Sequence, residues 1–210
     1  MQSLAQGKPV SSTAIVEENH PIFAVALKVI EDIHGDGELP IYYCRLDSEL
    51  LKRGTLRPSV DGNPELLVNP ARGAPVERLA TAVHEIGHLL DFFALPGEGF
   101  SSERNEALAS WRRAVAVSKS VDRLYTSLEE QRGMPQEELI QYFLRVRELF
   151  ARSYVQYIAS NTNNADLQHW LRVVEETIPT DSIPDQWGKE DFVPIKLALD
   201  ELFRRQEWRQ

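Results

Sequence analysis

The spacing of apolar residues along the chain predicts a short β-rich part followed by a longer helical part. Apolar side chains recur at helical spacing from Pro21 to Ile33, and Gly35 favours the end of this helix. Runs rich in β-branched and aromatic residues then predict three strands, at residues 40–46, 54–57 and 65–69. Turn residues at 59–64 separate the last two strands. We therefore expect a small N-terminal, mostly antiparallel sheet.

The remainder of the chain has helical spacing, interrupted where Gly and Pro gather. The predicted helices lie at residues 75–93, 103–132, 136–158, 166–176 and 192–208. Residues 1–20 are rich in Ser, Gln and Gly and show little periodicity, which is typical of a flexible leader. The pattern as a whole predicts an α+β fold in which residues 21–210 form a single domain around one core.

Composition and charge narrow the classes of function. The chain has 210 residues, of which 42% are hydrophobic and 26% charged, as in an ordinary globular protein. A formal charge of −9 argues against general binding to nucleic acid or to anionic membranes. No apolar run approaches the roughly 20 residues that cross a bilayer. The single cysteine, Cys44, and a polar N-terminus without a visible secretory signal favour a cytoplasmic protein, with a secreted effector as the alternative.

The predicted helix at residues 75–93 contains a pattern with metal chemistry. His84 and His88 are four residues apart, so both imidazoles lie on one face of the helix and can bind one Zn²⁺. Glu85 follows the first histidine, where it can act as general base toward a water molecule at the metal. This His-Glu-x-x-His pattern predicts a zinc site, although a surface helix carries the same residues by chance in a minority of cases.

A catalytic zinc site needs a third protein ligand. The metzincin extension is excluded, because its Gly and His positions are occupied by Asp91 and Ala94. Asp91 is better suited to orienting a ligand histidine or its helix. Two glutamates remain open as the third ligand. Glu106 lies in an Asn-Glu segment that looks like that of thermolysin-like peptidases, but it is slightly too close to the motif in sequence. Glu148 lies on an apolar helix, where a carboxylate needs a partner.

A resemblance favours Glu148. Two blocks of the chain carry the resemblance: Ala80–Phe92, with His-Glu-x-Gly-His-x-x-Asp, and Leu144–Ile158, with Glu-Leu-Phe-Ala-Arg-x-Tyr. They resemble the peptidase domains of the anthrax lethal-factor-like group and the metallopeptidase-like domains of phage and mobile-element polyvalent proteins. The resemblance implies a zincin-like fold of the gluzincin type, with His84, His88 and Glu148 on the metal. It also implies a tyrosine that stabilises the oxyanion, and Tyr142 lies near the corresponding place, one position off.

These observations predict a zinc-dependent endopeptidase that acts on a protein or peptide substrate. Residues 65–69 precede the motif helix, and we expect them to form the sheet edge along which an extended peptide lies. Arg152, one turn after Glu148, either pairs with Glu148 or Asp91 or lies in solvent. The alternative function is a non-catalytic interaction or assembly module of a phage or mobile element that uses the same fold. Substrate preference and oligomeric state are left open.

Overall fold

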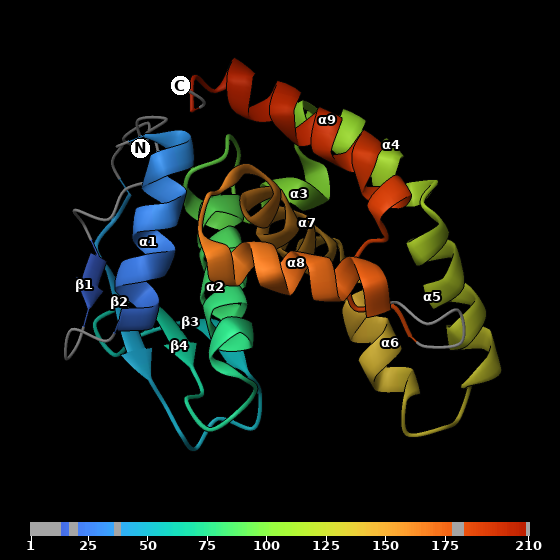
Figure 1. Ribbon diagram of the computed structural model, residues 1–210, viewed down its shortest axis with the longest axis horizontal. Helices are drawn as coiled ribbons and strands as arrows, with labels where there is room; N and C mark the ends of the chain where they lie inside the picture. Colours follow the sequence, from blue (N-terminus) through green and yellow to red (C-terminus); the bar gives the residue numbers. More distant parts are fainter. Residues whose placement is uncertain (1–13, 17–20, 36–38, 178–182, 209–210) are drawn as a thin grey trace.

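The computed structural model describes residues 14–16, 21–35, 39–177 and 183–208 and confirms the α+β class. A small sheet and helix α1 (Pro21–His34) lie at one side, and the remaining helices extend away from them (Figure 1). Helix α2 (Pro75–Phe93) runs between the two parts. No helix in the described ranges is both long and apolar enough to span a bilayer.

The sheet has four strands in the order β1-β2-β4-β3 and is mostly parallel. The strands are β1 (Ala14–Val16), β2 (Tyr42–Leu46), β3 (Gly54–Pro58) and β4 (Pro64–Val68). The pairs β1–β2 and β2–β4 are parallel, and only β3–β4 is antiparallel.

The prediction of a mostly antiparallel sheet is therefore wrong, and the reason for the error is the first strand. β1 falls inside the predicted flexible leader and is too short and too isolated to give a periodic signal; the rest of that leader lies outside the described residues. Because β1 is present, α1 becomes the crossover that joins two parallel strands, a connection that requires a dozen or more residues.

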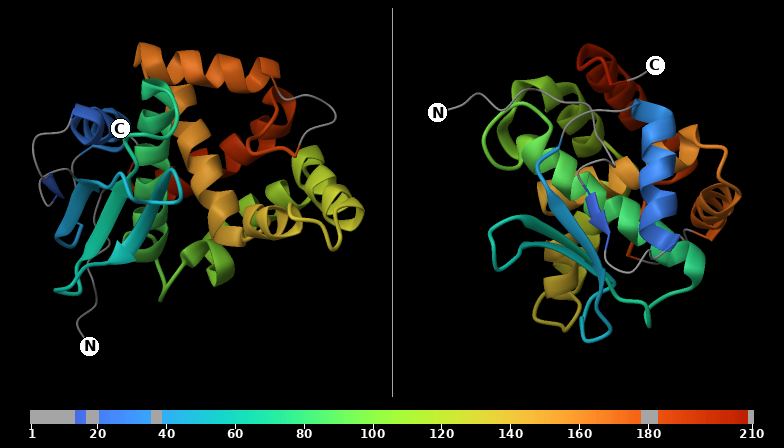
Figure 2. Two further views of the ribbon diagram at one scale, coloured as in Figure 1. Left: turned by 90° about the horizontal axis from the view of Figure 1, so that it is seen from below. Right: turned by 90° about the vertical axis from the view of Figure 1, so that its left-hand side faces the viewer.

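One face of the sheet packs against α1 and α2. Tyr42 and Cys44 of β2 and Leu66 and Val68 of β4 are buried on this face, as the alternation of side chains along a strand requires. The sheet, α2 and α7 (Val146–Asn161) follow one another as successive layers (Figure 2). Helix α7 lies at the centre of the helical part, and most of its residues are buried.

Helices α2 and α7 cross closely at Gly87. A Cβ atom built at Gly87 would lie 3.0 Å from Cδ1 of Tyr154 and 3.3 Å from Cα of Ala151, so any larger residue would push α7 away. The glycine within the His-Glu-x-Gly-His pattern thus allows the two helices to approach until their backbones almost touch. This crossing brings the residues one turn before Ala151 next to the histidines of α2.

The predicted helix at 136–158 is two helices, α6 (Glu137–Phe143) and α7. Leu144 ends the first, and Arg145 has extended backbone angles, φ −63° and ψ 131°. No Gly or Pro marks this break, and apolar spacing continues through it. The carbonyl of Phe143, which is left without a helical partner, accepts a hydrogen bond from the Arg152 guanidinium. A buried tertiary contact therefore stabilises a break that the local sequence does not indicate.

The other predicted helices also differ in extent. The expected helix at 103–132 is divided into α3 (Ser101–Arg104), the 3-10 turn η2 (Glu106–Leu108), α4 (Ala109–Ala116) and α5 (Lys119–Glu130). Helices α8 (Ala165–Thr177) and α9 (Lys189–Arg205) correspond to the last two predictions. Within the proline-interrupted loop, residues 178–182 lie outside the described residues.

Candidate metal centre

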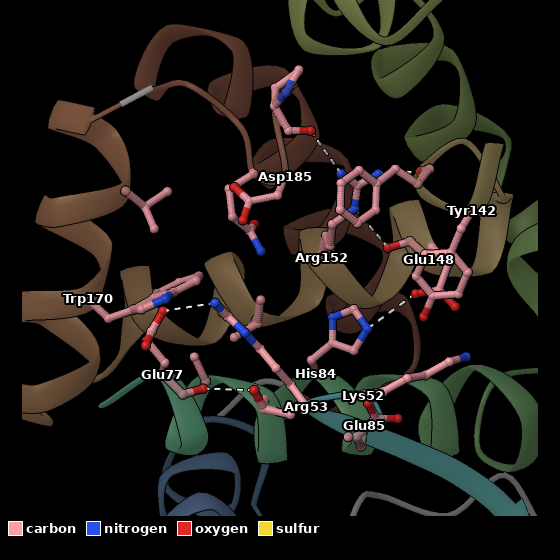
Figure 3. A pocket seen from close by; sticks show the side chains of 18 of the residues that line it. Lys52, Arg53, Glu77, His84, Glu85, Tyr142, Glu148, Arg152, Trp170 and Asp185 are labelled. Atoms are coloured by element: carbon pink, nitrogen blue, oxygen red, sulfur yellow. Dashed lines mark hydrogen bonds and ion pairs between the residues drawn. The ribbon is translucent and has the colours of Figure 1, made fainter. Parts of the chain in front are cut away.

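The side chains of His84, His88 and Glu148 meet where α2 crosses α7. One potential ligand atom from each lies within 4.8 Å of the others, and the group could hold a metal ion. Nε2 of His84 is 3.4 Å from one carboxylate oxygen of Glu148, and Nε2 of His88 is 3.5 Å from the other. His84 and Glu148 face each other across the pocket in Figure 3. The two helices supply the ligands from opposite sides.

The spacing of these donor atoms fits a small tetrahedral ion. Two atoms bound to one zinc at 2.0–2.2 Å in tetrahedral geometry lie roughly 3.3–3.6 Å apart. The two separations between a histidine nitrogen and a Glu148 oxygen, 3.4 and 3.5 Å, fall in this range, and the three ligand atoms together lie within 4.8 Å of one another.

Two of the three groups, His84 and Glu148, have pKa shifts that suit a metal, whereas the burial of His88 is outweighed by its contacts with Glu148 and Glu85, which raise its pKa. Burial acts to raise the pKa of Glu148, but the contacts with His84 and His88 outweigh it and hold that pKa well below its usual range. Burial lowers the pKa of His84, which favours the neutral imidazole. A deprotonated carboxylate and a neutral imidazole are the forms that bind metal.

Glu106, the other candidate third ligand, lies away from this group. It begins the 3-10 turn η2 and its side chain is exposed, whereas Glu148 is 5% exposed. Of the two glutamates that the sequence left open, the fold brings Glu148 to the histidines. Glu106 is not part of the group of described residues whose ligand atoms converge.

Glu85 lies against the neighbouring edge strand. Its carboxylate accepts a hydrogen bond from the backbone of Leu56, and burial raises its pKa to about 7. A Cβ atom at Gly54 would lie 2.8 Å from Oε1 of Glu85 and 2.6 Å from Cγ2 of Thr81. Glycine at position 54 therefore lets strand β3 pass directly over Glu85. The result is a carboxylate that is buried, close to the two histidines, and able to change protonation near neutral pH.

Tyr142 also reaches the site. It lies at the end of α6, lines the same pocket as His84 and Glu148, and is hydrogen-bonded to Glu148. Figure 3 shows the ring beside the Glu148 carboxylate. In one continuous helix, residues six apart would point about 120° away from each other. The break before α7 is therefore what allows Tyr142 and Glu148 to share one pocket.

Arg152 maintains that break. Its guanidinium is buried and donates to the backbone carbonyls of Phe143 and Pro184, the latter over 3.3 Å. It also lies over the Phe143 ring, 5.0 Å from its centroid. Neither proposed carboxylate partner of Arg152 is within ion-pair distance, and the residue is not exposed to solvent. Arg152 instead connects the end of α6 and the loop before α9 to α7.

Asp91 anchors the segment that follows the motif helix. Its two carboxylate oxygens accept hydrogen bonds from the backbone N–H of Ser102, over 2.7 Å, and from the Ser102 hydroxyl, over 2.6 Å. Asp91 is fully buried, and burial raises its pKa to about 6. Its hydrogen bonds therefore orient α2 against α3. Of the two roles expected for Asp91, orienting a ligand histidine or orienting its helix, these contacts correspond to the second.

A large groove opens beside the metal-binding group. It has a volume of about 1310 Å³ and extends from His84 and Tyr142, between α2, α7 and α8, to Trp170 and Asp185 (Figure 3). Strand β3 borders it at Gly54, and in the described sheet β3 is an edge strand. The edge expected at residues 65–69 is wrong, because β4 lies between β2 and β3.

Several residues around the site were not predicted from the sequence. Gly54 and the cations Lys52, Arg145 and Arg147 line the pockets next to Glu85 and Glu148. The only local signal was a glycine as the first residue of the predicted strand at 54–57.

Comparison of the chain with protein families, curated proteins and solved structures finds no match.

Proposed function

We propose that this protein is a zinc-dependent endopeptidase with a zincin-like fold. The observation that carries the proposal is the convergence of His84, His88 and Glu148, whose ligand atoms lie within 4.8 Å of one another, with Glu85 beside them. His84, His88 and Glu148 would hold the zinc. When bound, zinc supplies a Lewis acid that lowers the pKa of water and polarises the scissile carbonyl.

The chain's own residues have distinct roles in hydrolysis. Glu85 takes the proton of the attacking water and passes it to the leaving amine, a task that suits a carboxylate with a pKa of about 7. The hydroxyl of Tyr142 donates a hydrogen bond to the oxygen on which negative charge develops. Burial is the main cause that raises the pKa of Tyr142 above its usual value, so the hydroxyl retains its proton at neutral pH.

Strand β3 supplies a place for the peptide. Its outer edge passes over Glu85 at Gly54, and an extended peptide can pair with that edge by strand addition. The backbone of the substrate would then lie between β3 and Tyr142, with the scissile carbonyl above the metal-binding group. The absence of a side chain at Gly54 lets this edge lie directly against the Glu85 carboxylate.

The first experiment measures metal and cleavage together. Purified protein should contain close to one zinc per chain, measured by mass spectrometry of the metal, and should cleave peptides from a generic library. The Glu85→Gln variant should retain zinc and lose cleavage, because the amide cannot accept the proton. Cleavage that survives this substitution would refute the role of Glu85.

The third ligand is tested with a matched pair of variants. Glu148→Ala should lose zinc, whereas Glu106→Ala should keep it, because the Glu106 side chain is exposed away from the site. The opposite result would reject the proposed ligand set. Stoichiometric zinc with no hydrolysis of any library peptide would favour a non-catalytic binding module instead.

A further inference from the structure

A second, smaller pocket lies on the His88 side of the metal-binding group. It has a volume of about 170 Å³ and is continuous with the site, since Glu85, His88, Tyr142 and Glu148 form its inner wall. Its outer wall consists of Lys52, Thr55, Leu56, Phe100, Arg145 and Arg147. The pocket is thus bounded by the edge strand on one side and by the start of α7 on the other. A substrate side chain next to the scissile bond would have direct access to it.

Three cations line this pocket together with the carboxylates of Glu85 and Glu148, and none of the three forms an ion pair with a described residue. No carboxylate among the described residues lies within ion-pair distance of Lys52, Arg145 or Arg147. Instead, the Lys52 ammonium lies 5.1 Å and the Arg145 guanidinium 5.4 Å from the centroid of the Tyr142 ring. The Arg147 guanidinium lies 5.1 Å from the centroid of the Phe100 ring. Aromatic rings hold the charged groups at the rim and leave their N–H donors available.

The position of the two arginines is unfavourable for the helix that carries them. Arg145 is the residue before α7 and Arg147 lies in its first turn. The positive end of the helix dipole repels cations there and favours Asp or Glu. The stability of α7 therefore does not account for these residues.

The larger groove differs in charge. Arg53, which lines the groove but not the smaller pocket, is 3.2 Å from a carboxylate oxygen of Glu77 and is therefore paired (Figure 3). Lys52 and Arg145 lie between the two cavities, and Arg147 lines only the smaller one. The carboxylates of Glu77, Glu138 and Asp185 line only the larger groove, so the smaller pocket has the larger share of cations.

We propose that the smaller pocket binds an acidic side chain of the substrate, so that the enzyme selects peptides with Asp or Glu at one fixed position near the scissile bond. This inference rests on the proposed peptidase function. Guanidinium groups bind carboxylates through paired, charge-assisted hydrogen bonds, and a pocket of this size admits one short side chain. The wall formed by Leu56 and Phe100 supplies apolar contact for the methylene groups of that side chain.

The preference is tested by sequencing cleavage products. Zinc-loaded protein is incubated with peptides from a digested proteome, and cleavage sites are identified by mass spectrometry. We expect Asp and Glu to be enriched at one position, always on the same side of the cut. For a peptide pair that differs only by Glu or Gln there, kcat/KM should favour Glu by about tenfold, as for a charge-assisted hydrogen bond.

Substitution of Arg147 assigns the preference to the pocket. Arg147→Gln should remove the preference for Glu, and Arg147→Glu should reverse it toward Lys or Arg. Both variants should also unfold at a higher temperature than wild type, because a cation is removed from the helix N-terminus. Arg172→Gln and Arg172→Glu, at an exposed position of α8 that lines neither cavity, should leave the preference unchanged.

Failure of this inference is distinct from failure of the proposed function. Cleavage without acidic enrichment, or with an enrichment that Arg147→Glu does not alter, overturns the inference and leaves the peptidase intact. If nothing is cleaved, a random heptapeptide library is selected for binding to the zinc-loaded protein. Bound peptides enriched in Asp and Glu, with the enrichment lost in Arg147→Glu, support an acidic-peptide pocket, and equal composition of bound and input peptides rejects it.

Discussion

The close crossing of α2 and α7 at Gly87 provides a sensitive test of how the fold assembles the metal site. In Gly87→Ala the new methyl group would lie 3.0 Å from Cδ1 of Tyr154 and 3.3 Å from Cα of Ala151. These contacts are tighter than ordinary packing, and the backbone of α7 cannot rotate away as a side chain would. The two helices must separate by a few tenths of an ångström.

Two opposing terms set the size of the effect. Replacing Gly by Ala within a helix stabilises it by about 1 kcal/mol. Inserting a methyl group into a tightly packed interface costs about 1–3 kcal/mol. The net change in the free energy of unfolding of the metal-free protein should therefore be a loss of about 0–2 kcal/mol.

The effect on zinc should be larger. Glu148 lies one turn before Ala151, so it moves with the displaced helix. Zinc–ligand distances tolerate shifts of only about 0.2 Å, and we expect zinc affinity to fall by about tenfold or more.

The assay combines urea denaturation of the metal-free protein with competitive chelator titration of the zinc form. Gly188→Ala is the matched control, because a Cβ atom there meets nothing within 4 Å and the residue has φ −64°. It should change the start of α9 slightly and leave zinc affinity unaltered. A Gly87→Ala protein that is more stable than wild type and binds zinc equally well would refute the reasoning.

Three further predictions concern buried polar groups. Burial raises the pKa of Glu85 from 4.5 to about 7. The folded metal-free protein therefore binds this proton more tightly than the unfolded chain does. As a result, the free energy of unfolding falls as pH rises from about 4.5 to 7. Glu85→Gln should remove this pH dependence of the free energy of unfolding, which amounts to about 3 kcal/mol and is measured by urea denaturation at several pH values. The same dependence of stability on pH in both proteins would contradict the prediction. Arg152→Met should lower the free energy of unfolding by about 2–4 kcal/mol, because the carbonyl of Phe143 loses its donor. A change below about 1 kcal/mol would show that the break before α7 persists without Arg152. Asp91→Asn should lower the free energy of unfolding by about 1–2 kcal/mol, because its hydrogen bonds to Ser102 are weakened, while zinc affinity stays within about twofold. Loss of zinc would instead place Asp91 in the metal site.

The helix that carries His84 and His88 was predictable because its features are local. The four-residue spacing of His84 and His88 places both on one helical face wherever the helix lies in the protein. Pro75 and Glu77 define its start, since the Glu77 side chain accepts a hydrogen bond from the backbone N–H of Ala74. The choice of Glu148 over Glu106 was different, because no local pattern shows which distant helix returns to the histidines.

The sheet and the small pocket were beyond the reach of local patterns. The direction of β2 relative to its neighbours depends on β1, three residues whose strand conformation comes from pairing and not from their own spacing. No local pattern distinguishes Arg145 and Arg147, because the break before α7 is what brings them to the pocket.

Periodicity along the chain therefore indicated which parts are mainly helical, although not where helices 103–132 and 136–158 break, and it placed two histidines on one helical face. The meeting of α2 with α7, the passage of β3 over Glu85 and the placing of Tyr142 next to Glu148 depended on packing between distant segments. Such packing is set by the volumes of residues like Gly54 and Gly87 in three dimensions. A one-dimensional pattern records that they are small, but it does not record which atoms come close to them.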